Sequence, residues 1–285
     1  KRRTNQFNRK YNNETLNQIN NSRNKNSKFH LSPNHKENKS NKNINYELLL
    51  FPNSGGGARN LIMNYIPTTY QNNIMIIQKY IEKPLLYKGR KCDMRLWILL
   101  NWDFNLYLIK EGHFKTTSSN YDVYSPNSYV HLTNYSVQKH SENFAKFETG
   151  NEISFTDFEN SYDNKISVKK DLLPNVKNII IHTMKSAKNK INKTERKICF
   201  EIFGFDFIFD ENINPFLLEV NTNPGLEISS PLIEMLIPRM IDDAFKLTID
   251  KIFLLDEENI KEMKKNPFIV EGYNDEENMW ELLWN

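Results

Sequence analysis

Three oxygen-bearing side chains in the last third of the chain have the types and spacing of a cation site. A hairpin loop of four residues between Asp210 and Pro215 would pair these two residues and place Asp206 opposite Glu219. Directly opposed side chains lie within about 5.5 Å at Cβ. Asn221 shares the face of Glu219, because side chains alternate along a strand.

The chemistry of this face follows from its charges. Two opposed carboxylates repel and raise each other's pKa unless a cation lies between them. Hard oxygen ligands without His or Cys favour Mg²⁺, here Mg²⁺ that carries nucleotide phosphates. The alternative is a solvated hairpin face, and the strongly apolar residues around Asp206 and Glu219 argue against it.

A second set of chemical groups alternates along one apolar run. Lys91, Asp93 and Arg95 would share one face of a strand, while Cys92 and Met94 take the other. Lys and Arg can hold phosphate or carboxylate groups, with Asp93 orienting them. A salt-bridged face turned to solvent is the alternative.

Two further signals are weaker. The glycines at 55–57 could let backbone N–H groups approach a phosphate, but a flexible loop explains them equally well. His131 could act as a base. A lone His beside apolar residues is more often structural, so no catalytic role is assigned to it.

The elements that must position these groups are strands followed by helices. The expected strands are apolar or aromatic runs, at 47–51, 74–77, 91–100, 106–109, 199–209 and 215–221. Helical periodicity is found at 176–191 and 229–253, and Pro238 should kink or divide the second helix. Hairpins without regular βα alternation predict an α+β fold.

Composition bounds the class of protein. The chain has 285 residues, of which 39% are hydrophobic, enough for a sizeable core. Its 2 cysteines are too few for a disulfide framework or a Cys-based zinc site. No apolar stretch is long enough to span a bilayer. We therefore expect a cytoplasmic chain that does not bind membranes.

Charge and composition divide the chain unevenly. Residues 1–45 hold 11 Lys or Arg, 2 Glu and 14 Asn, and we expect a disordered, basic, low-complexity tail. It would be either a solvating segment or a weak electrostatic arm for an acidic partner. The expected domains are this tail, a catalytic region at 46–255 and an acidic C-terminal extension at 256–285.

Several motifs together resemble the tubulin–tyrosine ligase and ligase-like family, in its order and near its spacing. They are Gln78-Lys-Tyr-Ile-Glu-Lys-Pro84, Arg90-Lys-Cys-Asp-Met-Arg95, His131-Leu-Thr-Asn134, and Phe203-Gly-Phe-Asp206 through Leu218-Glu-Val-Asn221. The resemblance runs from about Leu50 to Phe253. The stretch from His131 to Glu152 is similar to the tyrosine ligases of the family in particular.

The resemblance implies an ATP-grasp fold, with ATP held between two α+β lobes. It implies an adenine hinge at Gln78, Lys79, Tyr80 and Ile81, and nucleotide contacts from Lys91, Asp93, Thr133 and Asn134. Arg95 and Lys115 would be catalytic residues that face the incoming substrate. Asp206, Glu219 and Asn221 would hold Mg²⁺, with Glu219 also catalytic.

The family's reaction implies the partners. ATP activates a carboxylate as an acyl phosphate, which an amino group then attacks. The acceptor would be the acidic C-terminal tail of tubulin, the donor a free amino acid with tyrosine as the lead, and the location the microtubule cytoskeleton. No nucleic acid is expected. The alternatives are a tubulin polyglutamylase, a ligase for a small peptide, and an inactive microtubule-binding protein.

Three departures from the family pattern bear on these expectations. Lys115 stands where the family usually has Arg, which keeps the charge and loses the bidentate fork. No Lys precedes the glycines at 55–57. The tail at 1–45 stands where the family has its N-terminal lobe, so we expect a largely complete C-terminal lobe and a missing or truncated N-terminal one.

Overall fold

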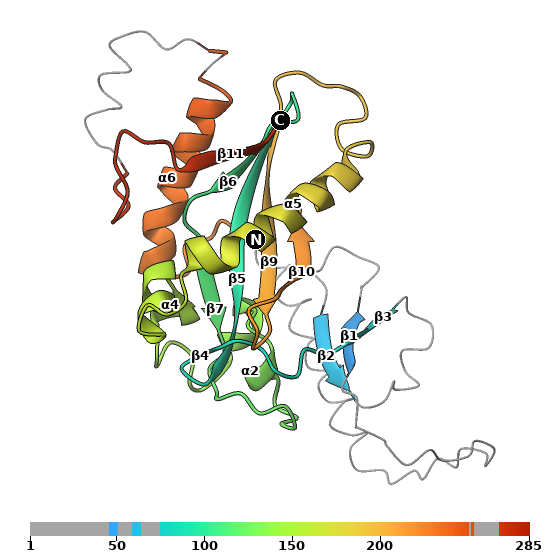
Figure 1. Cartoon of the computed structure of the whole chain (residues 1–285), viewed down its shortest axis with the longest axis vertical. Coiled ribbons are helices and arrows are strands. Elements are labelled where there is room, and N and C mark those ends of the chain that lie inside the picture. The colour runs from blue at the N-terminus through green and yellow to red at the C-terminus, as the bar shows by residue number, and fades with distance from the viewer. Residues whose placement is uncertain (1–45, 51–58, 64–74, 251, 254–267) are drawn as a thin grey trace, which may run out of the picture. The chain divides into compact units, whose positions relative to one another are not determined.

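The computed structural model describes residues 46–50, 59–63, 75–250, 252–253 and 268–285. These residues form two antiparallel sheets and several helices (Figure 1). The expectations for the tail at 1–45 and for the glycines at 55–57 lie outside the described residues. The same is true of the first part of the C-terminal extension.

The smaller sheet has three strands in the order β2-β1-β3. They are β1 (Tyr46–Leu50), β2 (Arg59–Met63) and β3 (Met75–Lys79). β1 pairs with both neighbours, and its register places Glu47 opposite Gln78. β3 confirms the strand expected at 74–77 and leads directly into the hinge residues.

The larger sheet has eight strands around one long central strand. Its main path runs β10-β9-β5-β6-β11, and every pairing is antiparallel. The path comprises β5 (Arg90–Asn101), β6 (Leu106–Ile109), β9 (Phe200–Phe209), β10 (Pro215–Asn221) and β11 (Trp280–Trp284). Three short strands complete the sheet: β4 (Leu86–Tyr87), β7 (His113–Thr116) and β8 (Glu152–Ile153).

β5 is the strand on which the site depends. It pairs with β9 along most of its length and with β7 at its first half. Asn101 ends the strand, and its side chain accepts a hydrogen bond from the Asn105 backbone N–H at 2.8 Å, which closes the expected hairpin to β6. Lys91 and Asp93 are only 7% and 4% exposed. The alternative of a solvent-facing charged strand is therefore wrong.

One long helix crosses the sheet. α5 (Leu173–Ala187) contacts β10 and β11, which form the two edges of the main path, so it spans the sheet from edge to edge (Figure 1). Its buried residues Leu173, Val176, Ile180 and Met184 recur at helical spacing. This helix begins three residues earlier and ends four residues earlier than the pattern at 176–191 predicted.

The C-terminal helix is shorter than its apolar pattern. α6 (Pro231–Leu247) begins at Ser230, whose Oγ accepts a hydrogen bond from the Ile233 N–H as an N-cap. It continues through Pro238, so of the two expected effects of this proline, a kink or a division, the division does not occur. Ser229 lies outside the helix.

The segment between β7 and α5 holds short elements only. They are α2 (Ser128–His131), α3 (Tyr135–Gln138) and α4 (Phe155–Ser161), with one 3₁₀ turn at Thr149–Asn151 and one π-helical turn at Val168–Leu172. The mixture of helices and antiparallel sheet confirms the α+β class. No helix among the described residues is long and apolar enough to cross a membrane.

Candidate active site

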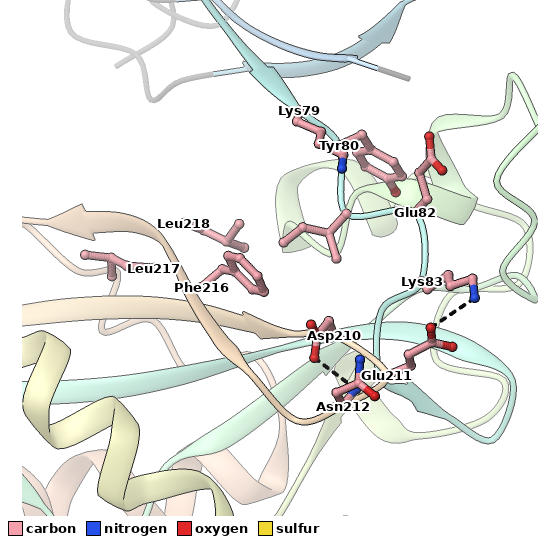
Figure 2. Close-up of a pocket in the computed structure, with 11 residues that line it drawn as sticks. Lys79, Tyr80, Glu82, Lys83, Asp210, Glu211, Asn212, Phe216, Leu217 and Leu218 are labelled. Carbon is pink, nitrogen blue, oxygen red and sulfur yellow. Dashed lines mark hydrogen bonds and ion pairs between the residues drawn. The ribbon is translucent and has the colours of Figure 1, made fainter. Parts of the chain in front are cut away.

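A pocket opens between the hinge and the β9–β10 hairpin. It measures about 450 Å³ and is lined by residues of both segments, namely Lys79–Lys83, Asp210–Asn212 and Phe216–Leu218 (Figure 2). Lys79, Tyr80 and Ile81, three of the four residues expected to form the hinge, line this pocket. Gln78 lies one residue earlier in β3, and its side chain is outside the described part of the structure.

Hydrogen bonds join the hinge segment to the hairpin loop at one end of the pocket. Lys83 donates to Glu211 at 3.0 Å across the mouth of the hairpin, and the Glu211 N–H donates to the Lys83 carbonyl at 2.8 Å (Figure 2). Asp210 accepts from the backbone N–H groups of Asn212 and Asn214, both at 2.9 Å. These bonds fix the hairpin loop against the hinge.

The β9–β10 hairpin brings Asp206 and Glu219 together by a different register from the one expected. The observed ladder pairs Phe209 with Pro215, so the loop has one more residue than predicted, and the pairing of Asp210 with Pro215 is wrong. A bulge between Leu217 and Glu219 then shifts the register by one, and Asp206 pairs with Glu219 after all.

The bulge decides which face Glu219 takes. A one-residue shift moves side chains to the other face of a strand. Without it, Glu219 would lie opposite Phe205, which is fully buried in the core. With it, Glu219 and Asn221 share the face of Asp206, and the Asn221 amide donates to Glu219 Oε1 at 3.2 Å.

Arg95 and Asp206 form a cross-strand pair between β5 and β9. The Arg95 guanidinium donates through Nε to Asp206 Oδ1 at 2.5 Å and through Nη2 to Oδ2 at 2.9 Å. Gly204 makes room for this group, since a Cβ at that position would lie 3.1 Å from Arg95 Nη1. The glycine of the Phe203-Gly-Phe-Asp206 motif therefore has a steric purpose.

Lys115 forms ion pairs with two acids. Its Nζ lies 2.9 Å from Asp93 Oδ1, its partner across the β5–β7 ladder, and 3.1 Å from Asp206 Oδ2. Burial alone would lower the pKa of Lys115, but Asp206 and Asp93 outweigh burial and raise it. Burial alone would raise the pKa of Asp206, but Lys115 and Arg95 lower it strongly. Both cations are therefore charged, and so is Asp206.

Glu219 has the opposite environment. Burial raises its pKa, and the negative charge of Asp206 raises it further. The described residues contain no group of three or more His, Cys, Asp or Glu placed to hold a metal. Asp206, Glu219 and Asn221 instead offer two carboxylates and an amide oxygen, a hard donor set that suits Mg²⁺. A divalent cation here would also relieve the repulsion between the two acids.

Lys91 is held by a chain of hydrogen bonds. His131 Nε2 lies 2.7 Å from the Ser125 carbonyl oxygen, so this nitrogen carries a proton. In the neutral imidazole, Nδ1 then accepts from the Tyr80 hydroxyl at 2.9 Å, and the Tyr80 oxygen accepts from Lys91 Nζ at 3.1 Å. His131 thus orients Tyr80, which fits the structural interpretation of this histidine.

Thr133 and Asn134 lie on the loop after α2. The Thr133 hydroxyl donates to Asp93 Oδ2, which joins the loop to the β5 charges. Asn134 precedes α3 and makes no capping hydrogen bond through its side chain. Thr133 therefore contacts Asp93 of the β5 charges, while Asn134 is its neighbour in sequence.

Sequence reasoning missed Glu152 as part of this face. β8 places Glu152 beside Lys115, and its carboxylate accepts from the hydroxyls of Ser229 and Ser230 at 2.5–3.0 Å. Burial raises the pKa of Glu152, although both hydroxyls oppose that rise. The pairing of β7 with β8 brings it here, and the signal that could have found it is the family-like stretch from His131 to Glu152, which ends at this residue.

The arrangement of charged side chains is suited to holding two negatively charged groups, such as a phosphate and a carboxylate, close to each other. Acids and cations run across five strands, from Glu219 and Asp206 through Arg95 and Lys115 to Glu152. Fixed charges of this kind can neutralise phosphate or carboxylate groups in a transfer reaction. The adjoining pocket has an apolar wall from Phe216 and Leu218, which suits a flat ring (Figure 2).

Comparison with known families gives one extended match. Residues 52–260 match the model described as "Tubulin-tyrosine ligase family". The matched stretch contains every residue of the face described above.

The chain is also similar to individual proteins that are named as tubulin-modifying enzymes. The chain is 35% identical over 221 residues to "Tubulin glycylase 3F" of Tetrahymena thermophila, an alignment covering 72% of this chain and 23% of the relative. It is 36% identical over 176 residues to "Tubulin polyglutamylase TTLL7" of Xenopus tropicalis, covering 53% and 19%. To "Tubulin monoglycylase TTLL3" of Homo sapiens it is 28% identical over 202 residues, covering 67% and 26%. The chain thus spans about a quarter or less of each relative's length.

Proposed function

The chain belongs to the tubulin-tyrosine ligase family, and from this premise we propose that it is an ATP-dependent ligase. Its acceptor would be a carboxylate in the acidic C-terminal tail of tubulin, and its donor a free amino acid. The observation that carries the proposal is the buried ladder Glu219–Asp206–Arg95, with Lys115 alongside. This ladder lies beside a pocket of nucleotide size.

The reaction has two balanced steps. An acceptor carboxylate oxygen attacks the γ-phosphorus of ATP, a P–O bond forms, the bridging P–O bond breaks, and ADP leaves. The amino nitrogen of the incoming amino acid then attacks the acyl carbon. A C–N bond forms, the acyl C–O bond breaks, phosphate leaves, and the nitrogen loses a proton.

The residues divide this work by position. Lys79, Tyr80 and Ile81 would contact the base in the pocket, and Gln78 would extend this hinge. Lys91, held by Tyr80, would neutralise a phosphate. Thr133 and Asn134 would contact ribose or phosphate.

The charged ladder would act on the reacting groups. Arg95 has a free edge at Nη1, which makes no hydrogen bond to a described residue, and this edge would bind the substrate carboxylate. Lys115 would hold Asp93 and Asp206 in place. Its single ammonium charge lacks the bidentate fork of Arg.

Asp206, Glu219 and Asn221 would hold Mg²⁺. When bound, this ion supplies charge neutralisation for the phosphates. Burial and the charge of Asp206 raise the pKa of Glu219, and a cation bound between the two acids would favour its ionised form.

For the amino acid, we propose glycine as the lead, with glutamate as the alternative. Tyrosine was the expectation from sequence motifs, but the relatives described above are named as glycylases and a polyglutamylase. Lys115 is paired with two acids, and Arg95 offers one edge for one substrate carboxylate. The second carboxylate of a glutamate donor would need a further cation, whereas glycine carries no second carboxylate.

The decisive experiment supplies purified chain with ATP, Mg²⁺, tubulin and one labelled amino acid at a time. We expect glycine to be incorporated into the tubulin tail, as measured by mass spectrometry. The matched control is Glu219→Gln, which keeps the shape and removes the charge. It should lower incorporation by roughly 100-fold or more, since removing one electrostatic group typically costs that much.

Other outcomes would change the proposal in defined ways. Incorporation of glutamate or tyrosine alone would replace glycine as the donor. Modification of free peptides but not of tubulin would indicate a small-peptide ligase. Absence of all incorporation, with equal microtubule binding by the chain and by Glu219→Gln, would indicate an inactive microtubule-binding protein. An active ligase would act at microtubules in the cytoplasm.

A further inference from the structure

A dense group of cations lies at the end of the sheet where β9 begins. Residues 185–197, which we call the basic segment, connect the last turn of α5 to the start of β9. Six basic side chains stand here against the single acid Glu195. All six are exposed: Lys185, Lys188, Lys190, Lys193, Arg196 and Lys197.

This group contrasts with its surroundings. The other residues from 46 to 285 hold 21 basic and 32 acidic side chains, so the basic segment is a positive feature on an acidic background. Within the described ranges, no carboxylate lies within ion-pair distance of any of the six cations. By comparison, Lys177 on the same helix is paired with Glu281 at 2.8 Å.

The basic segment also has a defined shape. The Asn192 side chain closes a turn, accepting from the Arg196 N–H and donating to the Arg196 carbonyl, both at 2.9 Å. Asn192 and Glu195 adopt positive φ values of 48° to make this turn. Lys193 and Arg196 are thus presented from a closed loop, which lowers the entropy lost when a ligand binds them.

Two of the cations are braced by aromatic rings. Lys185 Nζ lies 4.6 Å from the centre of the Trp284 ring, and Lys188 Nζ lies 5.0 Å from that of Phe104. The two rings contact each other at 5.8 Å. These contacts fix the two lysines over the outer end of the sheet without neutralising their charge.

The position of the basic segment relative to the ladder follows from β9. The strand begins at Phe200 and reaches Asp206 six residues later, at the face where the ladder lies. At about 3.3 Å per residue, the two positions are roughly 20 Å apart along the strand. An acceptor polypeptide whose reacting carboxylate lies near Asp206 and Glu219 must therefore be longer than about six residues for its far end to reach the basic segment.

We propose that the basic segment is a docking surface for an acidic stretch of the acceptor polypeptide, distant from its reacting carboxylate. This inference rests on the proposed function, since it concerns the acceptor of that reaction. The charge complementarity and the absence of ion pairs to these six cations among the described residues favour an acidic polypeptide as the occupant. Docking would raise the local concentration of the acceptor at the ladder without touching the reacting groups.

The test uses two Glu-rich acceptor peptides that share the same reacting end, one of about 20 residues and one of about four. The variant carries Lys190→Gln, Lys193→Gln and Lys197→Gln. We expect its KM for the long peptide to rise roughly tenfold, as for the loss of three exposed ion pairs. Its kcat, and its KM for the short peptide, should stay within twofold of the parent values.

The matched control removes the same charge elsewhere. Lys146, Lys165 and Lys170 are exposed as well, and their triple Gln variant should leave both KM values unchanged. Equal effects of the two triple variants, or equal effects on the two peptides, would overturn the docking surface. So would tighter binding of an RNA oligonucleotide of equal charge that the basic-segment variant abolishes.

Fluorescence anisotropy with the long peptide separates this inference from the proposed function. Binding that the basic-segment variant weakens, in a chain that ligates no amino acid, would support the surface and contradict the ligase. Ligation by a chain whose peptide binding is the same in both triple variants would support the ligase and contradict the surface.

Discussion

Two arginine–aspartate pairs in this chain differ in what surrounds the arginine. Arg239 and Asp243 lie one turn apart on α6, and their side chains are 2% and 1% exposed. Arg95 and Asp206 lie on neighbouring strands, and the Arg95 side chain is 14% exposed. The pairs have similar chemistry, so the difference lies in what the remaining donors of each guanidinium contact.

Each of the three guanidinium nitrogens of Arg239 donates to a described residue. Besides Asp243, its guanidinium donates to four backbone carbonyls of the C-terminal segment at 2.5–3.1 Å, those of Phe268, Asn274, Asp275 and Glu277. Asp243 in turn accepts from the Met279 N–H at 2.8 Å. This pair holds the segment that leads into β11, with all three guanidinium nitrogens engaged.

Toward the described residues, Arg95 donates hydrogen bonds along one edge of its guanidinium. Nε and Nη2 bind Asp206, while Nη1 faces the space that Gly204 keeps open. A buried pair with an unused edge can bind an anion, whereas a buried pair with none can only stabilise the fold. The two arginines therefore differ in how many guanidinium nitrogens donate to described residues, which is three in Arg239 and two in Arg95.

The largest expected effect concerns Arg239. Arg239→Met removes the partner of a buried carboxylate and of four carbonyls, so the free energy of unfolding should fall by about 3–5 kcal/mol. Urea denaturation of the purified chain measures this loss. A change below about 1 kcal/mol would show that the C-terminal segment is not held by this residue.

The next effect should appear in activity. Arg95→Lys keeps one positive charge beside Asp206 but loses the free guanidinium edge, so incorporation of amino acid should fall roughly 100-fold. Lys115 still neutralises Asp206, so the loss of stability should stay near 1 kcal/mol. An equal loss of stability in Arg95→Lys and Arg239→Met would contradict the claim that the two arginines differ in their contribution to the fold.

The smallest expected effect concerns Gly204, which leaves room for the Arg95 guanidinium. Gly204→Ala places a methyl group 3.1 Å from Arg95 Nη1 and 3.0 Å from Pro224 Cβ, so the guanidinium must shift by a few tenths of an ångström. We expect activity to fall about tenfold, in line with the sensitivity of catalysis to small misplacements. Gly225→Ala is the control substitution, because a methyl group added at Gly225 would meet no described atom within 4 Å.

The strands of the larger sheet were the most predictable part of the fold. Apolar runs marked β5, β6, β9 and β10 to within one or two residues. β11 was missed, because Trp280–Trp284 has only five residues and pairs with β6, which lies about 170 residues earlier in the chain. Local pattern does not reveal a partner so far away.

The pairing of Asp206 with Glu219 shows a correct result reached by incomplete reasoning. Spacing predicted the pair through a loop of four residues, whereas the structure uses a longer loop and a compensating bulge. Bulges depend on packing against neighbouring strands and leave no clear mark in a single sequence. The pair was predictable, and the register by which it forms was not.

The sequence by itself determined the types of groups in the site and their alternation along β5 and β9, because a strand of period two fixes which residues share a face. It also determined the family, through motifs that together span most of the matched stretch. Tertiary structure alone decided which charges are paired: Lys115 with two acids, Glu152 with Ser229 and Ser230, Arg239 with the C-terminal segment. The physical reason is that burial makes an unpaired charge costly, so each partner is selected in space from residues that the sequence keeps far apart.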